Sequence, residues 1–288
     1  MKLTIWGAAR QVTGSMHLLE TEDYSILIDC GLDYEKDTWV EENEQFPFSP
    51  AEIDLVILTH AHIDHSGNLP TLVRSGFEGQ ILCTAPTADL TELLLLDSVN
   101  IFLSRQRKTR KGKKEFSTGP KPLYLQKHVM ETVDRFVTIS FNKAFRINGL
   151  ISLTFIPIGH LLGAAAVVLT IEEHGVKKTI AFSGDIGRKN YPVLQDPEQL
   201  PEVDYLVCES TYGGRMHKST ISVEELLTET VNEACVKSAG RLIIPAFSVG
   251  RTQALVYSLN KLFSQGLLPK IKVFVDSPMA SYATDIFR

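Results

Sequence analysis

An apolar run leads directly into a cluster of metal-ligand side chains in the sequence Asp54-Leu55-Val56-Ile57-Leu58-Thr59-His60-Ala61-His62-Ile63-Asp64-His65. The β-branched run predicts a buried strand, and residues 66–70 predict a turn that feeds a helix. The three histidines and the aspartate are then placed at the carboxyl end of a strand, where α/β sheets usually carry their binding sites. We interpret residues 60–65 as a metal-binding loop.

The spacing within this loop indicates two metal ions. His60 and His62 stand at positions i and i+2 and can converge on one ion, while Asp64 and His65 can turn toward another. Neutral imidazoles suit zinc, and a carboxylate among them suits a second hard or borderline cation. The alternative is an ordinary polar loop, but an H-x-H-x-D-H string at a strand end is far more specific than a single ligand pair.

The composition is that of an ordinary globular protein. The 288 residues are 44% hydrophobic and 22% charged, which is enough chain for one large domain or two smaller ones. No apolar stretch approaches the roughly 20 residues of a membrane helix, and residues 1–7 predict a strand rather than a signal peptide. We therefore expect a cytoplasmic protein with no membrane contact.

The cysteines and the net charge exclude further classes. Cys30, Cys83, Cys208 and Cys235 lie far apart with no C-x-x-C pair, so neither a disulfide framework nor a thiolate zinc site is indicated. A net charge of -5 gives no global attraction to nucleic acid. The local exception is the basic stretch 105–114, which we leave open between a solvated, mobile loop and a nucleic-acid contact.

Three more ligand-type side chains stand at the ends of predicted strands. Asp29 ends the strand 24–29, and it is either a turn former or a partner of the metal loop. His160 follows the strand 151–156 and is flanked by glycines. Asp185 follows the hairpin that pairs 164–171 with 176–183.

The last third of the chain changes character. Strands are predicted at 205–209, 241–245 and 271–275, and helices at 222–238 and 250–265. A βαβαβ alternation implies a parallel sheet with right-handed crossovers. A domain boundary is therefore expected near residues 210–220.

Taken in this order and spacing, Asp29, the loop 60–65, His160 and Asp185 resemble the metallo-β-lactamase superfamily. The motifs Cys208–Gly213, Pro245–Gln253 and Asp276–Ala280 resemble its β-CASP branch of RNA-processing nucleases. The resemblance implies an α/β fold, with an αββα metallo-β-lactamase sandwich over residues 1–212 and the start of a parallel-sheet β-CASP domain over 213–288.

The resemblance also implies roles for individual residues. Two zinc ions would be bound, one by His60, His62 and His160 and the other by Asp64 and His65, with Asp185 between them. The implied catalytic residues are Asp29, which orients the ligand loop, Asp64, and Glu209, which matches the branch's first additional acidic motif. Arg251 and Ser248 would contact the substrate.

The implied activity is zinc-dependent hydrolysis of RNA by a metal-activated hydroxide, as an endonuclease, a 5′ exonuclease or both. We expect single-stranded RNA as the partner, with DNA left open, and a homodimer as one arrangement of the chain. Two other functions compete: a small-molecule hydrolase on the same scaffold, and a non-catalytic RNA-binding subunit of a processing complex.

The sequence departs from the family at its carboxyl end. The family's β-CASP region includes two further histidine motifs and then returns the chain to the lactamase domain with another histidine for the second zinc, whereas this sequence ends at Arg288. His217 lies in no matching context. We therefore expect an amino-terminal part of a longer nuclease, a weakened second zinc site and slow cleavage by the chain as given.

Overall fold

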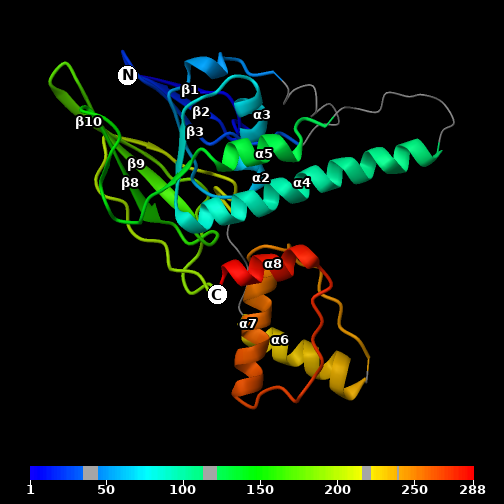
Figure 1. The fold of residues 1–288 in the computed structure, drawn as a ribbon. Helices are drawn as coiled ribbons and strands as arrows, with labels where there is room; N and C mark the ends of the chain where they lie inside the picture. The colour runs from blue at the N-terminus through cyan, green and yellow to red at the C-terminus, as the bar shows by residue number, and fades with distance from the viewer. Residues whose placement is uncertain (35–44, 113–121, 216–221, 239) are drawn as a thin grey trace.

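A computed structural model describes residues 1–34, 45–112, 122–215, 222–238 and 240–288. Two β-sheets lie face to face, with helices outside them (Figure 1). The first sheet contains, in spatial order, β1 (Lys2–Ile5), β2 (His17–Glu20), β3 (Ser25–Ile28), β4 (Leu55–Ile57), β5 (Gln80–Cys83) and β6 (Phe136–Thr138). The second contains β11 (Tyr205–Val207), β10 (Val176–Phe182), β9 (Ala165–Glu173), β8 (Ile151–Pro157) and β7 (Phe145–Arg146).

The strand directions decide which strand ends meet. In the first sheet β1, β2 and β3 are antiparallel, as predicted for an opening of hairpins, and β4 to β6 continue parallel to β3. In the second sheet β8 and β10 both run antiparallel to β9, so they run in the same direction as each other. The β9–β10 hairpin closes through His174 and Gly175 with φ values of 52° and 75°, which is the conformation of a tight hairpin turn.

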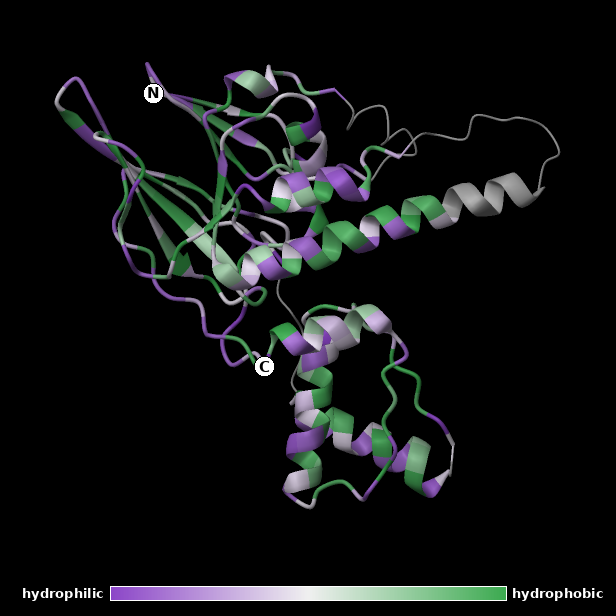
Figure 2. Cartoon of the chain, in the orientation of Figure 1, coloured by the Kyte–Doolittle hydropathy of each residue, from purple (hydrophilic) through white to green (hydrophobic). Residues whose placement is uncertain are grey.

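The main core lies between the two sheets. Side chains that alternate along β3, such as Ile26 and Ile28, meet Phe155 of β8 and Val167 of β9, and all four are buried. This burial follows from the two-residue period of a strand, which turns every second side chain inward. Figure 2 shows the resulting apolar colour along the strands.

Helices cover the outer faces of both sheets. Two of them, α3 (Leu69–Arg74) and α5 (Gln126–Val133), lie on the side of the first sheet, where Leu72 packs on Val56. On the second sheet, Val168 packs in one cluster with Leu90 of α4 (Ala85–Gly112) and Ala283 of α8 (Pro278–Ile286). The αββα sandwich is therefore confirmed. The remaining elements are η1 (Pro50–Glu52), α2 (Ile63–Ser66), α6 (Val223–Val231), η2 (Asn232–Lys237) and α7 (Arg251–Ser264).

The loop alternative for the basic stretch 105–114 is wrong for most of its length, because α4 continues as a helix to Gly112. Arg, Lys and Gln are good helix formers, and adding residues to a helix that has already formed is far easier than starting one. Residues 113 and 114 lie outside the described residues.

Two of the predicted strands in the last third are also wrong. Segments 241–245 and 271–275 have no regular secondary structure and pair with no strand among the described residues. Ile243 and Phe274 are 85% and 82% exposed, and both segments run largely green in Figure 2. A β-branched run forms a strand only where the backbone of another strand lies beside it and hydrogen-bonds to it. The helices predicted at 222–238 and 250–265 are confirmed.

Within the described residues, no helix combines the length and the apolar character that crossing a bilayer requires.

Candidate metal centre

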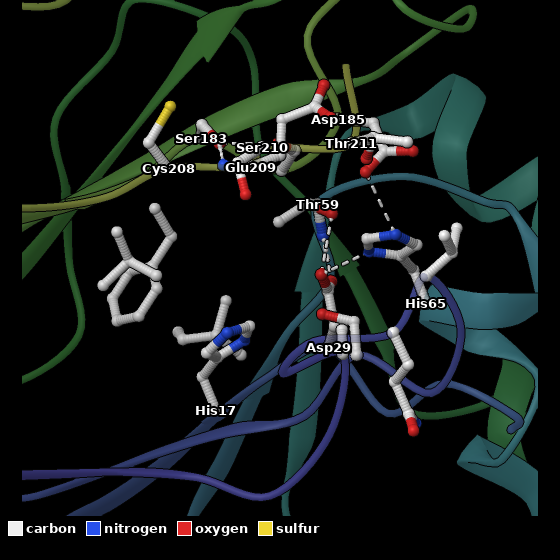
Figure 3. A pocket seen from close by; sticks show the side chains of 18 of the residues that line it. His17, Asp29, Thr59, His65, Ser183, Asp185, Cys208, Glu209, Ser210 and Thr211 are labelled. Carbon is white, nitrogen blue, oxygen red and sulfur yellow. Dashed lines mark hydrogen bonds and ion pairs between the residues drawn. The ribbon is translucent and has the colours of Figure 1, made fainter. Parts of the chain in front are cut away.

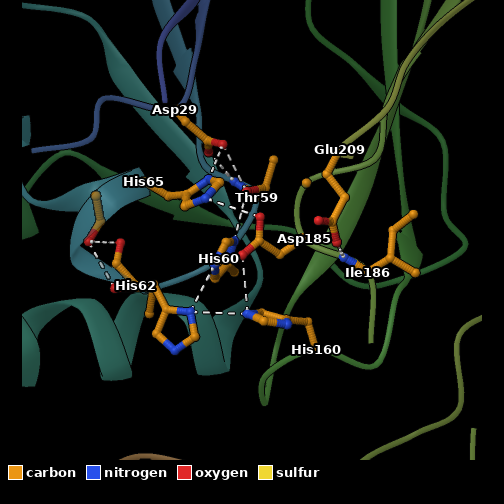
Figure 4. A network of polar contacts seen from close by, with 12 residues as sticks. Asp29, Thr59, His60, His62, His65, His160, Asp185, Ile186 and Glu209 are labelled. Atoms are coloured by element: carbon orange, nitrogen blue, oxygen red, sulfur yellow. Dashed lines mark hydrogen bonds and ion pairs between the residues drawn. The ribbon is translucent and has the colours of Figure 1, made fainter. Parts of the chain in front are cut away.

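The carboxyl ends of β3, β4, β8 and β10 meet at one edge of the sandwich (Figure 4). Asp29 follows β3, the loop from His60 follows β4, His160 follows β8, and Asp185 follows β10. Parallel strands deliver their carboxyl ends to the same edge, and the two sheets face each other there. The topology therefore brings together side chains that are up to 156 positions apart, between Asp29 and Asp185.

Four of the predicted ligands form one compact group. Ligand atoms of His60, His62, His160 and Asp185 all lie within 4.8 Å of one another. Nδ1 of His62 lies 3.1 Å from Nε2 of His60 and 3.1 Å from Nε2 of His160. Oδ2 of Asp185 lies 3.4 Å from Nε2 of His160 and 3.9 Å from Nε2 of His60.

These separations fit a zinc ion. Four donors about 2.1 Å from a tetrahedral zinc stand about 3.4 Å from one another. The observed separations of 3.1 to 3.9 Å bracket this value. The donor set of three imidazoles and one carboxylate is also one that zinc accepts. The four residues therefore fit a divalent metal site.

Thr59 fixes the proton position on His60. The Thr59 hydroxyl donates its one hydrogen to Oδ2 of Asp29 at 3.0 Å, so at its 3.0 Å contact with Nδ1 of His60 it must accept. His60 therefore carries its hydrogen on Nδ1 and presents the lone pair of Nε2 to the centre. A hydrogen bond of this kind behind a ligand histidine orients the ring and makes it a better ligand.

Asp29 holds the ligand loop in place through hydrogen bonds to Thr59 and His65. It is 2% exposed, and its Oδ1 accepts the Thr59 backbone N–H at 2.8 Å. Its φ of +62° lies in the left-handed region, which Asp tolerates better than most residues. Next to it, a Cβ at Gly31 would overlap the Asp64 carbonyl oxygen, so this turn packs directly on the ligand loop.

His65 lies between two carboxylates. Its Nδ1 is 2.7 Å from Oδ2 of Asp29, and its Nε2 is 3.3 Å from Oδ1 of Asp185. When Nδ1 donates to Asp29, a neutral ring would point the Nε2 lone pair at the Asp185 oxygen, which is repulsive unless a proton or a cation lies between them. Asp64 belongs to the same group, because it interacts electrostatically with both His65 and Asp185.

The protonation states follow from burial and from these partners. Burial lowers the pKa of His60 and His160 and lowers that of His62 to about 3, so these rings are neutral near pH 7 and free to bind metal. Burial also acts to lower the pKa of His65, but Asp29 and Asp185 together outweigh it and raise that pKa well above the usual value. In the metal-free chain, the proton of His65 takes the place that a cation can fill.

Two threonine hydroxyls, those of Thr84 and Thr87, hold the loop that carries His160, and we call this pair the hydroxyl clasp. The hydroxyls of Thr84 and Thr87, at the start of α4, donate to the carbonyl oxygen of Gly163 at 2.7 and 3.0 Å. Both threonines are buried, and a Cβ at Gly163 would come within 2.7 Å of their atoms. The backbone three residues after His160 is therefore fixed against the helix.

Glu209 holds the loop that carries Asp185. Its Oε1 accepts the backbone N–H of Ile186 at 2.6 Å, and its own N–H donates to the Ser183 hydroxyl at 3.0 Å. Glu209 thus ties the end of β11 to both sides of Asp185. Figure 4 shows it beyond Asp185, on the side away from His62.

The two predicted substrate contacts lie in the last third. Arg251, the first residue of α7, is near enough to His62 to affect its pKa, and its guanidinium lies 5.3 Å from the centre of the Phe247 ring. Ser248 contacts the Ser277 hydroxyl at 3.1 Å, and its backbone carbonyl accepts a hydrogen bond from Gln253. Of these two residues, Arg251 is the one that interacts electrostatically with a metal ligand, His62.

A cavity of about 330 Å³ opens beside the centre (Figure 3). Asp29, His65 and Asp185 line one part of it, and Glu209 and Arg10 line others. Substrate atoms that enter it can therefore reach the His65 side of the centre. Arg10 was not singled out from the sequence, because it lies in a turn that carries no recognisable motif.

Other residues of the site were also missed from the sequence. Thr59 directly precedes the first ligand, and this position was the available signal for its role. Thr84 and Thr87 had no such signal, because they bond to a carbonyl 79 and 76 positions away.

Known proteins with similar sequences span the whole of this chain. A ribonuclease from Thermus thermophilus is 34% identical over 289 aligned positions, which cover 100% of this chain and 61% of that protein. A transcription termination factor, FttA, from Methanothermobacter thermautotrophicus is 31% identical over 96% of this chain and 42% of its own length. The chain thus spans less than two thirds of either relative.

Comparison of structures supports the same fold. A crystal structure of a protein of unknown function from Enterococcus faecalis aligns with 99% of this chain and 67% of its own chain, at a TM-score of 0.53 and 15% sequence identity.

A family model described as the metallo-beta-lactamase superfamily matches residues 9–227. The chain therefore belongs to the metallo-β-lactamase superfamily, and its relatives place it in the β-CASP branch of that superfamily.

Proposed function

We propose that this protein is a metal-dependent hydrolase that cleaves phosphodiester bonds in RNA. The observation that carries the proposal is the group of His60, His62, His160 and Asp185, whose ligand atoms lie within 4.8 Å of one another. The relatives, a ribonuclease and a transcription termination factor, support RNA as the substrate.

The metals in this proposal are two zinc ions. His60, His62 and His160 hold one, Asp64 and His65 hold the other, and Asp185 lies between them. Metal ions held there supply Lewis-acid polarisation of the phosphate and lower the pKa of a water molecule toward neutrality. Two observations support a second cation: the open space beside His65, and the position between its Nε2 and Asp185, which a proton fills in the metal-free chain.

The protein's own residues orient these groups. Asp29 holds His65 and Thr59, and Glu209 holds the Asp185 loop through the Ile186 N–H. We therefore assign Asp29 and Glu209 as positioning residues. Asp64 remains a proposed ligand with a catalytic part.

Arg251 and Ser248 are the proposed substrate contacts. A guanidinium suits a phosphate because it presents several fixed donors, and Arg251 is already placed close to His62. The Ser248 hydroxyl contacts the hydroxyl of Ser277, so substrate would take the place of this contact. We keep the proposed division into residues 1–212 and 213–288, a cytoplasmic location and a homodimer as further parts of this proposal.

The proposal is tested with the zinc-loaded chain in excess over a labelled single-stranded RNA, so that slow cleavage is detected. We expect cleavage that EDTA abolishes and that His62→Gln reduces by at least a hundredfold. The matched control is His174→Gln, an exposed histidine paired with Glu22, which should cleave like the wild type. Cleavage that is equal in wild type and His62→Gln would overturn the proposal.

The substrate panel separates the remaining alternatives. Parallel assays use DNA of the same sequence, a thioester and a lactone. Hydrolysis of the thioester or lactone without cleavage of RNA would establish the small-molecule hydrolase instead. Binding of RNA without turnover of any substrate would establish the non-catalytic RNA-binding subunit. RNA labelled at the 5′ end and internally distinguishes an endonuclease from a 5′ exonuclease.

A further inference from the structure

A second cavity, of about 380 Å³, lies between α2, α4 and α8. Leu94, Asp97 and Phe102 of α4 line one wall. Tyr34 and Ile63 line another, and Met279 of α8 completes it. This volume falls within the range of about 300–1,000 Å³ that is typical of small-molecule sites. The cavity is separate from the one beside His65, with which it shares no lining residue.

Asp97 is the charged residue on a largely apolar face of α4. Leu94, Asp97, Ser98, Ile101 and Phe102 follow the i, i+3, i+4 spacing that places side chains on one side of a helix. The other polar side chain of this face, Ser98, is already bonded, because its Oγ accepts the Tyr124 hydroxyl at 3.1 Å. Asp97 is therefore the charged group that this cavity offers to a ligand.

The Asp97 carboxylate has unused acceptors. Among the described residues it accepts no hydrogen bond and forms no ion pair, and burial is what raises its pKa. A carboxylate that is partly removed from water without donors is destabilised, and donors supplied by a ligand remove that penalty. The cavity thus favours a ligand that has hydrogen-bond donors on one edge and flat apolar faces.

The position of the cavity connects it to the metal centre. Ile63 stands between the ligand His62 and the proposed ligand Asp64, so the ligand helix itself forms part of the wall. On the opposite side, Met279 follows the α8 cap Ser277, which contacts Ser248 three residues before Arg251. The walls of the cavity therefore include the ligand helix α2 and the helix α8, whose cap contacts Ser248.

Guanine matches these groups best. Its Watson–Crick edge presents two adjacent donors, N1–H and the N2 amino group, to the two oxygens of a carboxylate. Adenine and cytosine present one donor beside an acceptor, and uracil presents one donor between two acceptors. In all three bases a lone pair of the acceptor would face a carboxylate oxygen and repel it. Tyr34, Phe102 and Met279 supply the aromatic and thioether surface on which a base packs.

We propose that this cavity is a guanine subsite for the RNA substrate and that Asp97 selects the base. The inference rests on the proposed function for its substrate class, and it adds a base preference that the metal centre cannot supply. Asp97 is a specificity residue in this proposal and takes no part in cleavage.

The test measures binding of short uridine oligomers that carry one guanosine, adenosine, cytidine or inosine, with the zinc-loaded chain. We expect the guanosine oligomer to bind about tenfold more tightly than the all-uridine oligomer, the gain of a good bidentate contact. Inosine lacks the N2 amino group, so its oligomer should lose most of this gain. Asp97→Asn should abolish the preference, whereas Asp89→Asn, an equal charge change at an exposed site on the same helix, should keep it.

Equal binding of the guanosine and inosine oligomers by the wild type would overturn the subsite, and this result needs no folded variant. An unchanged preference in Asp97→Asn would also overturn it. Cleavage of RNA with no base preference removes the subsite and leaves the proposed function intact. Guanosine preference without metal-dependent cleavage removes the proposed function and leaves the subsite.

Discussion

Oδ2 of Asp29 lies 2.7 Å from Nδ1 of His65 and also accepts the Thr59 hydroxyl at 3.0 Å. One buried carboxylate oxygen therefore keeps a proton on Nδ1 of two histidines, so that Nε2 faces the metal centre: His65 directly, and His60 through Thr59. This relationship lets a single strand-end residue orient both sides of the metal centre.

Replacing Asp29 with Asn tests that arrangement. Asn tolerates the left-handed φ of this position, so the backbone is kept. Its single acceptor oxygen cannot serve the three donors that Asp29 receives, namely the Thr59 N–H, the Thr59 hydroxyl and His65 Nδ1–H. We expect zinc affinity to fall about 10- to 100-fold, measured by titration against a chelating dye.

The control for this variant is Asp134→Asn, which removes an exposed acid at the end of α5. Its zinc affinity should equal that of the wild type. Wild-type affinity in Asp29→Asn would show that the ligand histidines orient themselves without the carboxylate.

Gly163→Ala tests the hydroxyl clasp behind His160. Gly163 has a φ of +83°, and a Cβ there would meet the backbone N of Thr87 at 2.6 Å and Oγ1 of Thr84 at 2.7 Å. The control is Gly175→Ala, which has a φ of +75° with nothing within 4 Å of the added Cβ. Both variants should lose about 1–2 kcal/mol of unfolding free energy from the left-handed backbone.

Only Gly163→Ala should in addition lose zinc affinity, because its clash displaces the loop that carries His160. Urea unfolding and zinc titration of both variants separate the two effects. Equal zinc affinities in the two variants would show that the clasp does not position His160.

The ligand loop was predictable because a strand followed by His60, His62, Asp64 and His65 is a local pattern. A local pattern also indicated His160, because it stands at the end of a predicted strand. The function of Asp29 remained open from the sequence alone, because a turn former and a ligand support look the same there. The structure adds the contacts that join distant segments, such as Thr84 to Gly163.

The strands wrongly predicted at 241–245 and 271–275 and the loop wrongly predicted within 105–112 have one physical origin. Whether a segment becomes a strand depends on a partner backbone, and segments 241–245 and 271–275 have none among the described residues. Whether a basic stretch stays helical depends on the helix before it, and α4 supplies a formed helix up to that point. Neither condition is visible within the segment itself.

The four cysteines should differ sharply in reactivity. Burial raises the pKa of Cys83 to about 12 and that of Cys30 well above its usual value, so both remain thiols at pH 8. Cys208 is exposed at the rim of the cavity beside the metal centre. We expect iodoacetamide at pH 8 to label Cys208 first and to leave Cys30 and Cys83 unlabelled, as read by mass spectrometry.

Labelling of the chain unfolded in guanidinium is the control, and there all four cysteines should react. Labelling of Cys83 as fast as Cys208 in the native chain would contradict the burial of β5.

Acid should destabilise the metal-free chain in a defined pH range. Burial lowers the pKa of His60, His62 and His160 below their unfolded value of 6.5, so below that pH the unfolded chain binds protons that the folded chain does not. The pKa of His65 is raised, so its stabilising contribution is already complete below pH 6.5 and stays constant there. In EDTA, the free energy of unfolding in urea should therefore fall between pH 6.5 and 5. His62, whose pKa is lowered to about 3, should contribute on the order of 1 kcal/mol per pH unit to this fall. His62→Gln should reduce this slope by about one histidine's share, and a slope equal to that of the wild type would contradict the burial that lowers its pKa.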